Sequence, residues 1–171
     1  MFLEPLTLPP DRAIPGGLLT ELTALYGSQR DFHALSGDFP DPDDIRPEQV
    51  AAALADDLAD PDSEVLLARD EQRLAGIAIT LAHHPDPADP DPWIGLLMID
   101  AGSQRHGLGR RLASLVEDRF RAEGRTAVRL AVLENNPGGL AFWTALGYRH
   151  LAHRRDRQLG RPCAVLRKRL D

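Results

Sequence analysis

The stretch with the clearest chemical meaning links an apolar run to an amphipathic segment and reads Gln104-Arg105-His106-Gly107-Leu108-Gly109-Arg110. Its glycines stand where a helix is expected to begin, and a residue without a Cβ lets a ligand approach the backbone closely. The first N–H groups of a helix have no partner inside the helix, and the helix dipole favours an anion there. Two arginines and a histidine add positive charge. The segment therefore predicts a backbone cradle for a pyrophosphate group.

Two common phosphate-binding patterns are absent. The chain has no G-x-x-x-x-G-K-[ST] loop, which disfavours a nucleoside triphosphatase. It also lacks G-x-G-x-x-G after the apolar run, which disfavours a dinucleotide-binding fold.

Three side chains are candidates for a catalytic base: His83, His84 and Asp91. The histidines end one predicted strand and the aspartate precedes the next, so all three could face one site. Imidazole has a suitable pKa for a base near pH 7. The alternative is that the histidines are exposed loop residues beside Pro85. Two adjacent histidines without further spaced ligands do not define a metal site, and no metal is expected.

Hydrophobic periodicity predicts the elements that must hold these residues. Trp93–Ile99 is a continuous apolar run typical of a central strand buried on both faces. Leu108–Phe120 has the apolar spacing of an amphipathic helix, stopped by Gly124. Thr126–Leu133 reads as a strand, and a short helix runs from Asn136 to Gly147.

Further elements are predicted on both sides of this unit. Two helices, a hairpin and two closing strands are expected at Leu18–Tyr26, Val50–Leu58, Glu64–Arg69 with Leu74–Leu81, Tyr148–His153 and Cys163–Arg169, with a weak strand at Phe2–Leu8. The order predicts an α/β (α+β) fold, in which a central mixed β-sheet is flanked by about four helices. Residues 1–171 are expected to form a single domain.

Composition sets limits on the function. The chain has 171 residues, of which 43% are hydrophobic and 27% charged, as in soluble globular proteins. We expect neither a membrane span nor a signal peptide. A lone Cys163 suits a reducing cytoplasm. The net charge of −6 argues against nucleic-acid binding.

The charge is distributed unevenly along the chain. Asp31–Asp62 holds ten acidic residues and one basic residue, whereas Arg149–Arg169 holds eight basic residues and one acidic residue. Either these are two solvated surfaces, or the acidic segment, with the loop Asp86–Asp91, forms a mouth for a cationic substrate.

The sequence resembles the GNAT family, the GCN5-related N-acetyltransferases. Gln104-x-x-Gly107-x-Gly109 is similar to the family's Q/R-x-x-G-x-G/A motif. Asn136–Tyr148 is similar to its N-x-x-x-A-x-x-Y-x-x-x-G-F pattern, although Ala141 falls one place late. The order of strand, motif, long helix, strand and short helix is also that of the family.

The resemblance implies that the chain binds acetyl-CoA and transfers the acetyl group directly to a primary amine. That amine would belong to a small cationic molecule or to a peptide amino terminus. A homodimer is compatible with the sequence. The implied cofactor-binding residues are Leu97, Met98 and Ile99 on the central strand, Gln104, Arg105, His106, Gly107, Leu108, Gly109 and Arg110 in the motif, and Asn136 and Trp143 further on.

Two of these positions leave alternatives open. Asn136 either touches the pantetheine arm or only caps its helix. Trp143 stands where many members carry a tyrosine that protonates the departing thiolate, and an indole N–H cannot serve as that acid. Trp143 therefore favours a packing role. The alternative functions are a non-catalytic acyl-CoA-binding sensor or regulatory module, and a protein-directed acetyltransferase.

Overall fold

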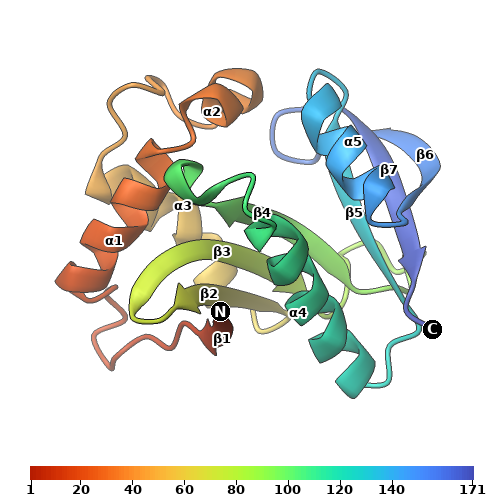
Figure 1. Cartoon of the computed structure of the whole chain (residues 1–171), viewed down its shortest axis with the longest axis horizontal. Helices are drawn as coiled ribbons and strands as arrows, with labels where there is room; N and C mark the ends of the chain where they lie inside the picture. Colours follow the sequence, from red (N-terminus) through yellow and green to blue (C-terminus); the bar gives the residue numbers. More distant parts are fainter.

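The computed structural model describes all 171 residues and contains one seven-stranded sheet in the order β1-β2-β3-β4-β5-β7-β6 (Figure 1). All neighbouring strands are antiparallel except β4 and β5, which are parallel. The strands are β1 (Phe2–Pro5), β2 (Ser63–Asp70), β3 (Arg73–Leu81), β4 (Trp93–Ile99), β5 (Ala127–Leu133), β6 (Arg149–Arg155) and β7 (Pro162–Arg169). The predicted mixed α/β fold is thus confirmed.

Five α-helices surround the sheet, compared with the four or so that were predicted. They are α1 (Gly16–Gly27), α2 (Arg30–Ser36), α3 (Pro47–Ala59), α4 (Leu108–Ala122) and α5 (Pro137–Ala145), with a short 3₁₀ turn, η1, at Ala101–Ser103. None of the helices is both long and apolar enough to cross a membrane.

The helix that the sequence did not predict is α2. It has only seven residues, too few to establish a periodic apolar face. Its end is marked by Gly37, which takes the left-handed conformation at φ +71°. Its His33 is buried between the rings of Tyr26 and Phe39, at centroid distances of 5.7 and 4.8 Å. Packing against α1 and the following loop therefore holds this helix in place.

The sheet carries a hydrophobic core on each face. Helix α4 contributes Leu112, Val116 and Phe120 to one core, which also holds Trp143 of α5. Helices α1 and α3 cover the opposite face at β2, β3 and β4 through residues such as Leu22 and Leu54. Strand β4 therefore has α4 on one side of the sheet and α1 and α3 on the other.

Strands β4 and β5 separate soon after they begin. Backbone pairing between them is limited to Trp93 with Arg129 and Ile94 with Leu130. Beyond Ile94 and Leu130 the strands share no register, and Figure 1 shows them running apart. We call this unpaired part, Gly95–Ile99 with Ala131–Leu133, the β4–β5 wedge.

The wedge opens at an irregularity in β4. The register against β3 shifts between Ile79 and Thr80, so that Gly95 is left as an extra residue in β4. Such a bulge bends a strand and increases its twist. Gly95 and Ala131 are exposed although both lie on central strands. The expectation that Trp93–Ile99 is buried on both faces was therefore wrong at Gly95, because β5 turns away there.

Candidate active site

The loop before α4 presents a row of free backbone donors. The six N–H groups from Arg105 to Arg110 donate to no backbone carbonyl, and no side chain accepts from them. The first N–H of the helix with a partner is that of Arg111, which donates to Gly107 O at 3.0 Å. Consecutive free donors at a helix start are the arrangement that binds phosphate oxygens. The loop therefore offers enough adjacent free donors for an anion of the size of a pyrophosphate.

Left-handed backbone conformations shape this loop. Gly107 has φ +78°, and an added Cβ there would meet no atom within 4 Å. Arg105 has φ +63°, which is uncommon for a residue with a side chain. Gly109 has a different role, because a Cβ there would lie 3.3 Å from Phe142 Cε2. Gly107 therefore shapes the loop, and Gly109 lets α4 pack closely on α5.

The side chains around the cradle leave its charge positive. Arg105, His106 and Arg110 are exposed and form no ion pair. Leu108 is half-buried and packs against the core under α4. The free N–H groups and the two unpaired guanidinium groups thus both attract an anion.

Gln104 links the loop to the end of β4. Its Nε2 donates to Gln29 Oε1 at 3.0 Å and to Ile99 O at 3.3 Å, and its own N–H donates to Ala101 O. Gln29 Nε2 donates to the same Ile99 carbonyl at 2.7 Å. Two glutamines therefore join the end of β4, the start of α2 and the cradle.

The other end of α2 is fixed to the β5 side of the wedge. Asn135, which follows β5, donates from Nδ2 to Leu35 O at 3.1 Å. Arg161 Nη1 donates to Ser36 O and, at 2.8 Å, to Asp38 Oδ1. Helix α2 therefore connects the separated ends of β4 and β5. Sequence reasoning missed Gln29, Asn135 and Arg161, because their roles depend on a helix that it did not predict.

The β4 residues of the wedge differ in burial. Leu97 is half-buried, whereas Met98 and Ile99 are buried in the cores on opposite faces. Ile99 can therefore offer only its backbone to a ligand in the wedge, and the backbone of Met98 faces β3. Since two glutamines already occupy the Ile99 carbonyl, the remaining groups there are donors along the strand edge.

Asn136 caps helix α5. Its Oδ1 accepts from Gly139 N at 2.9 Å, and its carbonyl accepts from Leu140 N at 3.1 Å. The side-chain oxygen is thus committed to its own helix, which is the capping alternative.

Trp143 is buried between Phe142 and Tyr148, at ring-centroid distances of 5.0 and 4.9 Å. The hydroxyl of Tyr148 donates to Glu117 Oε1 at 3.1 Å, and burial together with Glu117 raises the pKa of Tyr148. Neither aromatic residue can therefore supply a proton at neutral pH. This part of α5 and the loop after it contributes packing.

His83 and His84 lie in different environments. His83 is 66% exposed and its Nδ1 lies 2.8 Å from Asp62 Oδ1. The side chain of His84 is only 16% exposed, and its ring lies against Trp93 at the start of β4, with centroids 4.7 Å apart and the ring planes tilted by 31°. Its Nδ1 lies 3.0 Å from Asp86 N and 3.2 Å from Asp89 Oδ2. In the tautomer whose Nδ1–H donates to Asp89 Oδ2, Nε2 carries the lone pair and has no partner in the protein. His84 therefore lies beside the closed end of the wedge.

Burial lowers the pKa of His84, and Arg154 and Arg157 lower it further against the attraction of Asp89. The ring is thus neutral at pH 7 and can accept a proton.

Asp91 is held by two arginines. Its Oδ2 accepts from Arg129 Nε and from Arg167 Nε, each at 2.8 Å. Burial pushes the pKa of Asp91 upward, but the hydrogen bonds from Arg167 and Arg129 outweigh it and hold the pKa below its ordinary value. A carboxylate so engaged is a poor base.

Asp89 completes a buried ion cluster. Its side chain is 1% exposed and contacts Arg129, Arg154 and, at 3.2 Å, His84 Nδ1. The hydrogen bond from Arg154 holds the pKa of Asp89 below its ordinary value although burial opposes this. The cluster fastens the β3–β4 loop across β5 and β6.

The acidic segments carry less unpaired negative charge than the sequence suggested, because several of their aspartates form ion pairs with arginines. Asp38 pairs with Arg161, Asp43 with Arg30 and Asp44 with Arg46. In the second segment, the arginines of β5, β6 and β7 pair with Asp89 and Asp91. Much of the negative charge of the expected mouth is therefore neutralised within the protein.

Comparison with known proteins agrees with this geometry. The profile of the acetyltransferase (GNAT) family matches residues 29–148. The fold is similar to an acetyltransferase from Thermus thermophilus, with 21% identity, a TM-score of 0.71, and coverage of 99% of this chain and 97% of that chain. No curated protein sequence matches the chain.

Two further structures are similar. Ribosomal-protein-S18-alanine N-acetyltransferase from Escherichia coli has 17% identity and a TM-score of 0.65, with 99% of this chain and 95% of that chain covered. Spermidine N-acetyltransferase from Vibrio cholerae, in complex with CoA and spermine, has 14% identity and a TM-score of 0.66, with 98% and 95% covered.

The fold and the anion-binding loop are those of a CoA-dependent acyltransferase. The chain belongs to the acetyltransferase (GNAT) family, since the profile spans more than half of it. Acetyl-CoA is the cofactor of this family. The residues fit it, because the six free N–H groups from Arg105 to Arg110 and the unpaired guanidinium groups beside them suit a pyrophosphate.

Proposed function

We propose that the protein transfers the acetyl group of acetyl-CoA directly to a primary amine, carried by a small molecule or by a peptide amino terminus. The row of six free N–H groups from Arg105 to Arg110 carries this proposal. The spermidine and ribosomal-protein enzymes with a similar fold are named for amine acceptors. The internal pairing of the aspartates gives no reason to require a strongly cationic acceptor.

Each part of the site has a role in this reaction. Acetyl-CoA, when bound, supplies an activated thioester. The N–H groups of the loop would hold the pyrophosphate, and the β4 backbone beyond Gly95 would align the pantetheine arm. A free β4 N–H in the wedge would donate to the thioester carbonyl oxygen as negative charge develops on it.

His84 is the best placed candidate for the general base. An amine with a pKa near 10 must lose a proton before or during attack. With Nδ1–H donating to Asp89 Oδ2, the Nε2 of His84 can accept a proton, and the ring adjoins Trp93, two residues before the exposed Gly95. We propose that it accepts the proton through water. His83 and Asp91 suit this role less well, because one is paired with Asp62 and the other with two arginines.

No aromatic group is needed to protonate the departing thiolate. A thiol has a pKa of about 8.5, so its thiolate is an acceptable leaving group near neutral pH. Trp143 and Tyr148 can therefore keep their packing roles without preventing turnover.

The test is acetyl-CoA turnover over polyamines, aminoglycosides, amino acids and short peptides, followed by thiol release and by mass spectrometry of the products. Acetylated primary amines are expected. Tight CoA binding without turnover on any of these acceptors would replace the proposal with a non-catalytic CoA-binding module.

Replacing His84 with alanine is expected to lower kcat/KM by about 100-fold, the usual contribution of a positioned base. In the wild type, kcat/KM should fall as the pH drops through the pKa of His84, which lies below about 6.5. The variant should lose this acidic limb. The pH profile of kcat/KM measures both effects. His83→Ala is the matched control, and a similar loss in that variant would contradict the assignment.

A further inference from the structure

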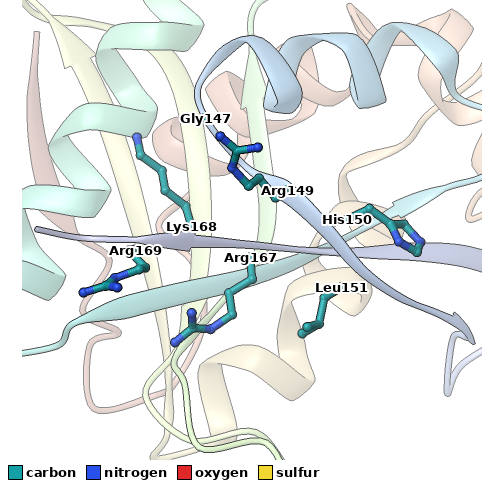
Figure 2. A pocket seen from close by; sticks show the side chains of 7 residues that line it. All are labelled: Gly147, Arg149, His150, Leu151, Arg167, Lys168 and Arg169. Atoms are coloured by element: carbon teal, nitrogen blue, oxygen red, sulfur yellow. The ribbon is translucent and has the colours of Figure 1, made fainter.

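A cavity lies at the free edge of the sheet, where β6 begins and β7 ends (Figure 2). Its volume is about 390 Å³, within the range of small-molecule sites. Its lining is strongly basic and consists of Gly147, Arg149, His150, Leu151, Arg167, Lys168 and Arg169. Because the whole chain carries a charge of −6, this concentration of cations is a local feature.

One cation of this lining, Arg149, has no carboxylate partner. Arg167 is engaged on the other side of β7, where Asp91 Oδ2 accepts from Arg129 and from Arg167, each at 2.8 Å. Successive residues of a strand point to opposite faces, so Arg167 and Lys168 lie on different sides of β7. Figure 2 shows Arg149 on the side of Lys168, away from Arg167. No carboxylate forms an ion pair with Arg149, so its guanidinium group is free to meet an anion.

Two other cations of the lining, Lys168 and Arg169, already have carboxylate partners. Lys168 contacts Glu117 at 2.7 Å, and Arg169 contacts Asp171 at 3.2 Å, so their carboxylates are already engaged. Figure 2 shows Lys168 and Arg149 both directed toward the Gly147 end of the cavity. Gly147 has φ +92°, a conformation that favours glycine, and a Cβ there would be in ordinary van der Waals contact with Lys168 Cε at 3.9 Å.

We propose that this cavity binds a phosphate group of a small anionic ligand, which takes the place of the missing carboxylate beside Arg149. Guanidinium groups match the oxygens of phosphate in a bidentate manner. The ligand is either a phosphate monoester or free phosphate. The site is separate from the CoA cradle, because the end of β7 pairs with the start of β5, whereas the cradle follows the opposite end of the parallel strand β4. The proposal does not depend on the acetyl-transfer reaction.

The test is thermal unfolding of the full chain at low ionic strength, with and without saturating CoA to occupy the cradle. Inorganic phosphate and phenyl phosphate are the probes, and sodium chloride at equal ionic strength is the reference. A rise in Tm of about 3–6 °C is expected at a probe concentration tenfold above its dissociation constant. The probe that raises the Tm more shows whether the ligand is a phosphate monoester or free phosphate.

Arg149→Gln should remove most of this rise, because it removes the one guanidinium group of the lining without a carboxylate partner. Arg157→Gln is the matched control, because Arg157 is exposed, lies outside the cavity and forms no ion pair. It should leave the rise unchanged.

Four results would overturn the proposal. The first is no rise beyond that with chloride, and the second is an equal rise in Arg149→Gln. The third is an equal rise with citrate, which would show that charge alone is recognised. The fourth is loss of the phosphate response in saturating CoA together with weaker CoA binding by Arg149→Gln, which would assign the cavity to the cofactor.

Discussion

Replacing Gly107 with alanine is expected to raise the dissociation constant for CoA about 10- to 100-fold, as expected for the loss of one charge-assisted hydrogen bond. A Cβ at Gly107 meets no protein atom within 4 Å, so only a ligand would contact it. The free N–H groups on both sides of Gly107 are the donors that the added methyl group would hinder. Isothermal titration calorimetry with CoA measures the effect.

Gly124 offers a matched control at the other end of α4. Its φ is +76°, and a Cβ there also meets nothing within 4 Å. Alanine in the left-handed conformation costs about 1–2 kcal/mol at either position. Both variants should therefore lose similar stability, and only Gly107→Ala should lose affinity. Equal affinities in the two variants would remove the basis for the cradle. Gly109 is unsuitable for this test, because a side chain there would displace Phe142.

The substitution Asp89→Asn is expected to cost about 3–5 kcal/mol of stability, because it removes the charged partner from a buried ion pair. Asp89 is 1% exposed and contacts Arg129 and Arg154. An asparagine would direct an N–H group at one of these guanidinium groups. The free energy of unfolding in urea measures the loss, which corresponds to a fall in Tm of roughly 6–20 °C.

The pH dependence gives a second check on Asp89. A carboxylate whose pKa is lowered by folding stabilises the protein above its unfolded pKa and loses this contribution as the pH falls through the folded value. The difference between wild type and Asp89→Asn should therefore shrink below a pH of about 4. Asp44→Asn is the control, since it breaks an exposed pair with Arg46 and should cost less than about 1 kcal/mol.

The elements near the cradle could be predicted because their signals are local. The apolar run Trp93–Ile99, the glycines at 107 and 109, and the apolar stripe of α4 can each be read within a few residues. The antiparallel hairpin around Asp70-Glu71-Gln72 was predicted for the same reason. Together they fixed the order of the elements and the place of the anion-binding loop.

The features that sequence reasoning missed depend on contacts between distant segments. Helix α2 is stabilised by Tyr26 and Phe39 and by Asn135 from across the wedge. The separation of β4 from β5 follows from a bulge, for which the only local signal was Gly95 within an apolar run. The ion cluster at Asp89 and Asp91 forms only once the β3–β4 loop lies over three other strands.

Helix α2 also acts as a strut of fixed length between the diverging strands. It has seven residues, and at a rise of 1.5 Å per residue it spans about 10 Å. Gln29 at one end and Asn135 at the other fasten it to the two sides, which closes a ring of backbone and hydrogen bonds around the wedge. The separation of the two strand ends is thus set by the number of turns in one short helix. An insertion or deletion in α2 would change that separation without any substitution in β4, β5 or the loop before α4.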